Sequence, residues 1–434
     1  MIKIKDTAGS IAIAMLSMVA LSMPAISQTV EDIDFFEAGG NYYCYPWLNQ
    51  APPAQTPAPE GYTPFHLEHY GRHGSRWHIG SYNYDVPYNL LLKAHHAGKL
   101  TPLGDETFHI VCDIREEFIK GRDGELSDKG AVQHQEIGKR MVENYPEIFS
   151  SDTYIDARST IVIRSILSMF NGLSGIQSLF PDIHIKTDAS KADMYYMNFS
   201  DTTHHRIKHH ADTTLLRDFS QKHANKGEYL SKLFNDADYA RDSIGSELFD
   251  PLFSLLINTQ SHYAQPWIAD KIFTIDEARE RWMIRNANWF LDAGNSKLTE
   301  NHQPYTQSNL VRNIIESADS AINSPVKSVN LRYGHDSIIM PLSCLLEINN
   351  FGREINDLED LANLGWHDYL AVPMASNIQI VFYKPAVNET VSDDDVLVKV
   401  LLNETECELP LQKVTGPYYK WSDFKNYYLK KING

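Results

Sequence analysis

Short strand-like segments alternate with helix-like segments at both ends of this chain, and a long helical stretch separates the two groups. Phe65 to Tyr70 alternates apolar and polar residues, which predicts a strand ending at Gly71. The residues that follow predict helices over Val86–Ala97, Leu103–Ile119, Asp128–Tyr145 and the segment around Arg164, and strands at Thr153–Asp156 and Asp182–Lys186. Alternating strands and helices are typical of an α/β sheet.

The second group begins at Ser328, where strand character returns as far as Tyr333. A helix is expected over Asp336–Ile348 and a final strand over Asn377–Tyr383. Between the groups, long amphipathic segments predict helices over Thr213–Phe234, Glu277–Ala293 and Ser308–Ile322. We therefore expect a mixed sheet flanked by helices, with a mostly α-helical lobe inserted over one end. Its parts are the core at 62–187 and 326–383, the lobe at 188–325, and a C-terminal hairpin with an aromatic-rich tail at 384–434.

The N-terminal residues 1–27 have the pattern of a secretory signal peptide. Lys3 and Lys5 precede an uncharged apolar run from Ser10 to Ala25, which ends in small residues near Ser27. This run is short for a membrane-spanning helix. Residues 28–61 are expected to be an extended lead-in, since 51–64 are rich in proline. The mature chain is thus predicted to be periplasmic or extracellular, with no membrane segment after signal removal.

Export makes disulfide bonds permissible. The four cysteines, Cys44, Cys112, Cys344 and Cys407, could form two bridges in any of three connectivities, and the sequence does not choose among them. Their wide spacing argues against a zinc site. Buried small side chains are the alternative for each cysteine.

The net charge of −17 argues against nucleic acid as a partner, because binding nucleic acid requires a basic face. An anionic ligand must therefore be held by a local cluster of positive side chains. The oligomeric state has no signal in the sequence.

The run Arg72-His73-Gly74-Ser75-Arg76 follows a predicted strand, where open α/β sheets bind ligands. Glycines on both sides of the Arg-His pair let the backbone turn sharply and approach a ligand. Guanidinium groups match the oxygens of a phosphate. A surface loop with incidental charges is the alternative.

Two further segments have the same strand-to-helix context. His335-Asp336 follows Gly334 at the expected start of a helix, where an anion is favoured, although Asp336 could be only an N-cap. Arg164 opens another predicted helix, an unfavourable place for a cation unless an anion binds there. A salt bridge would also explain Arg164.

These motifs, in this order, resemble those of the histidine acid phosphatases, the branch of the histidine phosphatase superfamily that includes phytases and multiple inositol polyphosphate phosphatases. The similarity covers residues 62–183 and 326–383, including Leu126 to Gly138 between the first two motifs. Two positions depart from the family pattern. His78 stands where the family often has proline, and His335-Asp336-Ser337 stands where the inositol polyphosphate phosphatases have His-Ala-Glu, which leaves that subgroup open.

The resemblance implies a phosphoglycerate mutase-like core and a small-molecule phosphate monoester as substrate, without a metal or cofactor. His73 would attack phosphorus and form a phosphohistidine, and Asp336 would protonate the leaving group. The phosphate would be bound by Arg72, Arg76, Arg164 and His335. Phytate and a broad range of monoesters are equally open as substrates.

Histidine-rich stretches support a second hypothesis, an exported protein that binds metal or a phosphate ligand without turnover. They comprise His66-x-x-His69, His95-His96, and His204-His205 with His209-His210. Solvated or capping histidines are the commoner explanation of such stretches.

Overall fold

A computed structural model describes residues 29–386 and 391–434. The predicted signal peptide, residues 1–27, lies outside the described residues. Within them, no helix is both long and apolar enough to cross a membrane.

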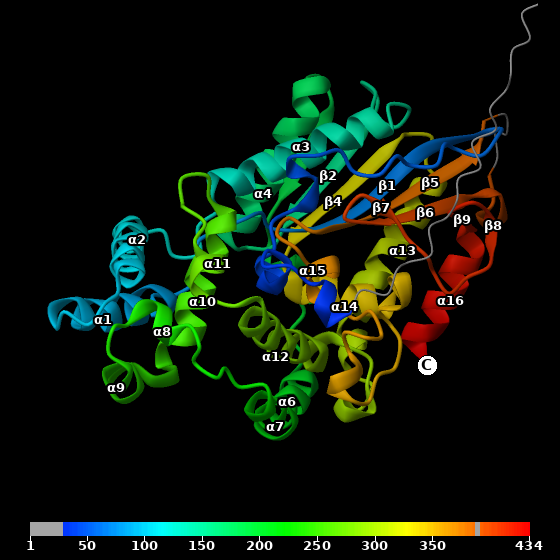
Figure 1. The fold of residues 1–434 in the computed structure, drawn as a ribbon. Helices are drawn as coiled ribbons and strands as arrows, with labels where there is room; N and C mark the ends of the chain where they lie inside the picture. The colour runs from blue at the N-terminus through cyan, green and yellow to red at the C-terminus, as the bar shows by residue number, and fades with distance from the viewer. Residues whose placement is uncertain (1–28, 387–390) are drawn as a thin grey trace, which may run out of the picture.

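The described strands form one mixed sheet in the order β3-β2-β4-β1-β5-β6-β9-β8, with β7 paired to β6 (Figure 1). β3, β2, β4 and β1 are parallel, whereas β5, β6, β9 and β8 are antiparallel to their neighbours. The bounds are β1 Tyr62–Arg72, β2 Tyr154–Ser159, β3 His184–Asp188, β4 Ser328–Gly334, β5 Asn377–Pro385, β6 Leu397–Leu402, β7 Thr405–Glu406, β8 Lys413–Thr415 and β9 Tyr418–Lys420. The predicted α/β class with a mixed sheet is confirmed.

Helices cover both faces of this sheet. α3 (Asp128–Asn144) and α4 (Ile163–Leu179) pack on one face, and α13 (Ser308–Ile322), α14 (Asp336–Leu345) and α16 (Trp421–Asn433) pack on the other (Figure 1). A third apolar core joins α1 (Tyr82–His96), α2 (Pro102–Phe118), α10 (Phe249–Ile257) and α12 (Ile275–Ala293). The shorter helices are α5 Met194–Met197, α6 Thr202–Ala211, α7 Arg217–Lys222, α8 Leu230–Leu233, α9 Ala237–Tyr239, α11 Ala269–Ile272 and α15 Asp368–Ala371.

Strand β1 shows why polar and apolar residues alternate in the centre of the sheet. Leu67 packs in the core on the α3–α4 side. Glu68 is 1% exposed and forms an ion pair with Arg332 of β4. The alternation therefore reflects a buried ion pair and not a strand with one solvated face.

Three expectations differ from the structure. Thr213–Phe234 is not one helix: a π-helical turn, α7 and α8 succeed one another, with a break where Asn225 Oδ1 accepts from the N–H of Gly227 at φ +80°. The lead-in is not extended throughout, because short 3₁₀ turns occupy Val30–Asp32, Glu37–Tyr42 and Pro46–Leu48. The C-terminal hairpin strands join the main sheet, and the aromatic tail is helix α16, which buries Trp421, Phe424 and Tyr428.

All four cysteines are free. Cys344 and Cys407 are buried, as small apolar side chains are. Cys44 accepts a hydrogen bond from Gln133 Nε2 at 3.2 Å. The two bridges that export would permit are absent among these four residues.

Candidate active site

Three parallel strands end side by side, and each end carries residues of the predicted site. β1 pairs with β4 so that Arg72 lies opposite Gly334. On its other side β4 pairs with β2, which ends at Ser159. His73 follows β1, His335 and Asp336 follow β4, and Arg164 follows β2 in the first turn of α4. The predicted location at the carboxyl ends of strands is confirmed.

The loop after β1 is held against two helices. The backbone N–H of Gly74 donates to Ser168 Oγ of α4 (3.1 Å), and that of Ser75 donates to Gln133 Oε1 of α3 (2.9 Å). A Cβ atom at Gly74 would lie 2.4 Å from the carbonyl oxygen of Gly130, so only glycine fits there. The close approach of this loop to α3 fixes the backbone that carries His73.

His73 has a defined tautomer in this arrangement. Its Nδ1 lies 2.9 Å from the carbonyl oxygen of Gly74. A carbonyl only accepts hydrogen bonds, so Nδ1 carries the proton and Nε2 keeps its lone pair. Burial, followed by the charges of Arg72 and Arg76, lowers the pKa of His73 well below its ordinary value. The imidazole is therefore neutral, as a nucleophile must be.

Arg72 is completely buried and rigidly held. Its Nη1 donates to the carbonyl oxygens of Asn41 (2.5 Å) and Val372 (2.6 Å). Its Nη2 lies 2.8 Å from Asp336 Oδ2. A guanidinium anchored in this way has little side-chain freedom left to lose when a ligand binds.

Arg76 and Arg164 are less fully paired than Arg72. Arg76 Nη1 donates to the carbonyl oxygen of Trp77 at 2.9 Å, and its guanidinium lies over the Tyr42 ring at 5.3 Å. The Nε atoms of Arg76 and Arg164, like that of Arg72, are buried without a hydrogen-bond partner among the described residues. Burial, together with Arg76, lowers the pKa of Arg164 to about 10. Groups of this kind are satisfied by an anionic ligand.

The charges of the site do not balance. The guanidinium groups of Arg72, Arg76 and Arg164 all act on His73, and Asp336 is the carboxylate that acts on both Arg72 and Arg164. Asp368 also acts on Arg72, so three guanidinium groups face two carboxylates and the site keeps an excess of positive charge. The negative charge of a phosphate monoester is complementary to this excess.

His335 lies close to the His73 ring, and Asp336 follows it directly in the chain. The rings of His73 and His335 are 5.7 Å apart, and His335 Nε2 lies 3.2 Å from Thr160 Oγ1. Burial lowers the pKa of His335 to about 4. Burial alone would raise the pKa of Asp336, but Arg72 and the hydrogen bond from Asn41 outweigh it and lower the pKa to about 2.

The N-terminal segment forms one wall of the site, which the sequence did not predict. Asn41 Nδ2 donates to Asp336 Oδ2 at 3.0 Å. The Tyr42 hydroxyl lies 3.1 Å from His78 Nδ1 and 3.5 Å from Arg76 Nη2. Thus His78, which departs from the family pattern, orients a tyrosine beside Arg76. The adjacent Gly39-Gly40 pair is the signal that could have indicated a close approach of this segment.

Asp368 anchors this N-terminal segment through hydrogen bonds. Its Oδ2 accepts from the N–H of Asn41 (3.1 Å) and its Oδ1 accepts from Trp282 Nε1 (2.9 Å). Gly40 has φ +57°, and a Cβ atom there would lie 2.5 Å from Asp368 Oδ2. Burial raises the pKa of Asp368 to about 6. Glycine at position 40 is therefore required for the turn that carries Asn41 into the site.

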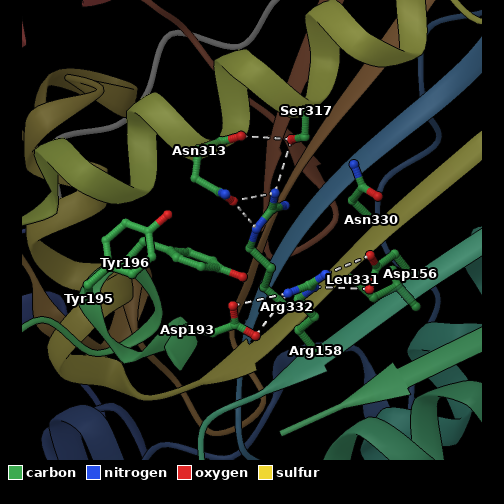
Figure 2. Close-up of a pocket in the computed structure, with 10 residues that line it drawn as sticks. All are labelled: Asp156, Arg158, Asp193, Tyr195, Tyr196, Asn313, Ser317, Asn330, Leu331 and Arg332. Carbon is green, nitrogen blue, oxygen red and sulfur yellow. Dashed lines mark hydrogen bonds and ion pairs between the residues drawn. The ribbon is translucent and has the colours of Figure 1, made fainter. Parts of the chain in front are cut away.

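A polar cavity of about 230 Å³ is lined by residues of β2 and β4 that precede the ends of these strands. Figure 2 shows Arg158 between Asp156 and Asp193, and Arg332 directed at Asn313 and Ser317 of α13. Arg332 also forms the buried ion pair with Glu68. Because these arginines already have carboxylate partners, this cavity lacks the excess positive charge of the His73 site.

The histidine-rich stretches do not assemble a metal site in the described part of the chain, where no group of three His, Cys, Asp or Glu side chains is placed to hold an ion. His66 Nδ1 lies 2.8 Å from the carbonyl oxygen of Ser328. His204 pairs with Asp292 at 3.2 Å, and His95 with Asp105 at 2.7 Å. Individual polar contacts account for His66, His95 and His204.

Comparisons with known proteins agree with this geometry. The family model of the histidine phosphatase superfamily (branch 2) matches residues 71–403. The match spans most of the chain, and the chain therefore belongs to this family and is a histidine acid phosphatase. The family expected from the motifs around His73 and His335 is thus confirmed. A comparison with curated proteins gives no match.

Solved structures with the same fold were found at low sequence identity. The multiple inositol polyphosphate phosphatase of Bifidobacterium longum, in complex with phosphate, is 18% identical, with a TM-score of 0.71 over 91% of this chain and 98% of that chain. The phytase from D. castellii is 15% identical, with a TM-score of 0.68 over 97% and 90%. Hafnia alvei phytase in complex with myo-inositol hexakis sulphate is 12% identical, with a TM-score of 0.53 over 86% and 98%. These likenesses extend over nearly the whole fold.

Proposed function

We propose that this phosphatase is exported and hydrolyses phosphate monoesters through a covalent phosphohistidine at His73. The observation that carries the proposal is the hydrogen bond from His73 Nδ1 to the Gly74 carbonyl, which leaves the Nε2 lone pair available. Nε2 forms the new bond to phosphorus as the bond to the leaving oxygen breaks. The carbonyl of Gly74 continues to accept from Nδ1–H, so it stabilises the positive charge of the phosphorylated ring.

In this mechanism Arg72, Arg76, Arg164 and His335 bind the phosphate oxygens, and Asp336 moves the proton. Asp336 is ionised in the free enzyme, since its pKa is about 2. A monoester monoanion, which prevails below a second pKa of about 6, brings one proton into the site. Asp336 passes that proton to the leaving oxygen, then accepts a proton from the water that attacks the phosphohistidine. The bond between Nε2 and phosphorus breaks with its electron pair returning to Nε2, and Asp336 passes the proton from water to the departing phosphate, so both residues return to their starting states.

The substrate class includes inositol polyphosphates such as phytate. The basis is the similarity to structures named as phytases and as an inositol polyphosphate phosphatase, together with the excess positive charge of the site. Two basic residues of the helical lobe are paired within the protein: Arg206 with Glu300 (3.3 Å) and Lys208 with Asp212 (2.9 Å). Phosphate release from phytate, a sugar phosphate and an aryl phosphate, measured across pH, distinguishes a phytase from a broad monoesterase.

The covalent step is tested with His73→Ala. We expect this variant to lose turnover on every monoester while remaining folded, because no other neutral imidazole occupies its position. Rapid quenching of the wild type with labelled substrate should trap label that is stable to alkali and labile to acid. Turnover by His73→Ala, or no trapped label, would contradict the proposal.

Export is tested separately. N-terminal sequencing of the exported protein should begin near Gln28.

The role of Asp336 is tested with Asp336→Asn. A group that protonates the leaving oxygen matters most when that oxygen is a poor leaving group. We therefore expect glycerol phosphate hydrolysis to fall by about 10²- to 10⁴-fold and aryl phosphate hydrolysis to fall far less. Equal losses on both substrates would exclude Asp336 as the donor.

A further inference from the structure

Asn41 reaches Asp336 from a part of the chain that contains no motif of the family. It lies on the short turn Glu37–Tyr42, 295 residues before Asp336, and its side chain is 7% exposed. Three of its groups make buried contacts: the backbone N–H to Asp368, the carbonyl oxygen to Arg72, and the side-chain amide to Asp336. Asn41 therefore contacts both Arg72 and Asp336, the first through its carbonyl oxygen and the second through its side-chain amide.

The two oxygens of Asp336 have different environments because of Asn41. Oδ2 accepts from Asn41 Nδ2 at 3.0 Å and lies 2.8 Å from Arg72 Nη2. Within residues 29–386 and 391–434, Oδ1 accepts one hydrogen bond, from the backbone N–H of Ser337 at 3.0 Å. An oxygen that accepts a hydrogen bond from an amide and lies against a guanidinium cation is a poor place for a proton.

We propose that Asn41 is a positioning residue for Asp336: it holds Oδ2 as the fixed, unprotonated oxygen, so that Oδ1 carries the proton delivered to the leaving group. Asn41 acts through Asp336 and takes no proton itself. Gly40 and Asp368 support this role, since they set the backbone turn from which the amide projects. The inference rests on the proposed function, in which Asp336 is the proton donor.

Asn41→Ala separates this role from a structural one, because the backbone contacts to Arg72 and Asp368 do not need the side chain. We expect kcat for glycerol phosphate to fall by about 10- to 100-fold, the cost of a misplaced catalytic group. The kcat for p-nitrophenyl phosphate should change by less than about threefold, because its leaving group needs little protonation. Competitive inhibition by inorganic phosphate should be unchanged, since the arginines remain in place. Asn49→Ala, an exposed asparagine of the same segment, is the matched control.

A double-mutant cycle completes the test. In an Asp336→Asn background, Asn41→Ala should cause no further loss on glycerol phosphate, because the group through which it acts is gone. Equal losses on alkyl and aryl substrates, or an additive loss in the double variant, would overturn the inference. If Asn41→Ala does not fold, Asn41→Ser serves in the same comparison. Failure of the proposed function itself would be distinct, since His73→Ala would then retain turnover.

Discussion

One arginine cluster of this molecule lies within the parallel part of the sheet and another lies at the ends of the parallel strands, and the two differ in the partners of their guanidinium groups. Arg158 of β2 and Arg332 of β4 lie opposite each other within the sheet. Arg158 pairs with Asp156 and Asp193 (Figure 2), and Arg332 pairs with Glu68. At the strand ends, Arg72, Arg76 and Arg164 all interact with Asp336, and Asp368 acts in addition on Arg72. Both arginines of the first cluster have carboxylate partners, so we call this cluster saturated. In the second cluster the guanidinium groups outnumber the carboxylates, which leaves excess positive charge.

This difference separates a structural use of arginine from a functional one. A buried cation with a carboxylate partner contributes to the fold because removing either member leaves an unpaired charge. Buried cations that face one another without enough carboxylates repel one another, and that repulsion is relieved only by an anionic ligand. The comparison predicts that substitutions in the two clusters affect different measurable properties.

The largest expected effect is on stability, in the saturated cluster. Arg332 is 4% exposed and Glu68 is 1% exposed, so Arg332→Met leaves a buried carboxylate unpaired. We expect the free energy of unfolding to fall by about 3–5 kcal/mol, measured by urea denaturation. Adding Glu68→Gln should restore much of the loss. The folded fraction of Arg332→Met should keep the wild-type kcat, and an unchanged stability would break the comparison.

The next effect is on catalysis, in the cluster with excess charge. Arg164 has no carboxylate within ion-pair distance among the described residues, so Arg164→Met removes a cation without orphaning an anion. We expect kcat/KM to fall by about 10²- to 10³-fold while the free energy of unfolding stays level or rises. Inorganic phosphate should raise the Tm of the wild type and of Arg332→Met much more than that of Arg164→Met. A loss of stability like that of Arg332→Met would show that both clusters are structural.

Most residues of the candidate site could be predicted from the sequence because they directly follow strands that the sequence also predicts. Arg72, His73, His335 and Asp336 come directly after strands whose apolar pattern is clear, and parallel strands bring their ends together. Asn41 had no such signal. It precedes the first strand, and its contact with Asp336 spans the chain. Long-range contacts of an irregular segment leave no periodic pattern in the sequence.

The fold shows the same division. Glu277–Ala293 and Ser308–Ile322 were predicted nearly to the residue, since both have amphipathic periodicity; the buried face of Ser308–Ile322 is apolar throughout. Thr213–Phe234 had a similar pattern, but the local hydrogen bond between Asn225 and Gly227 competes with helix geometry and ends it. At that point the hydrogen bond between the Asn225 side chain and the nearby backbone outweighs the apolar periodicity that favours a helix.

The smallest expected effect is a shift in the pH profile. Turnover requires neutral His73, so kcat/KM declines as pH falls through the pKa of this histidine in the free enzyme. Burial, with Arg72, Arg76 and Arg164, lowers that pKa, and the acid limb of the wild type should therefore lie well below pH 6.5. Arg164→Met removes one of these cations and should move the limb to higher pH by about one unit or less. Arg332→Met should leave the limb in place, because Arg332 lies within the sheet and its charge is balanced by Glu68. The second ionisation of the substrate is the same for every variant, so a limb that moves equally in both, or in neither, would mean that the cluster at the strand ends does not set the protonation of His73.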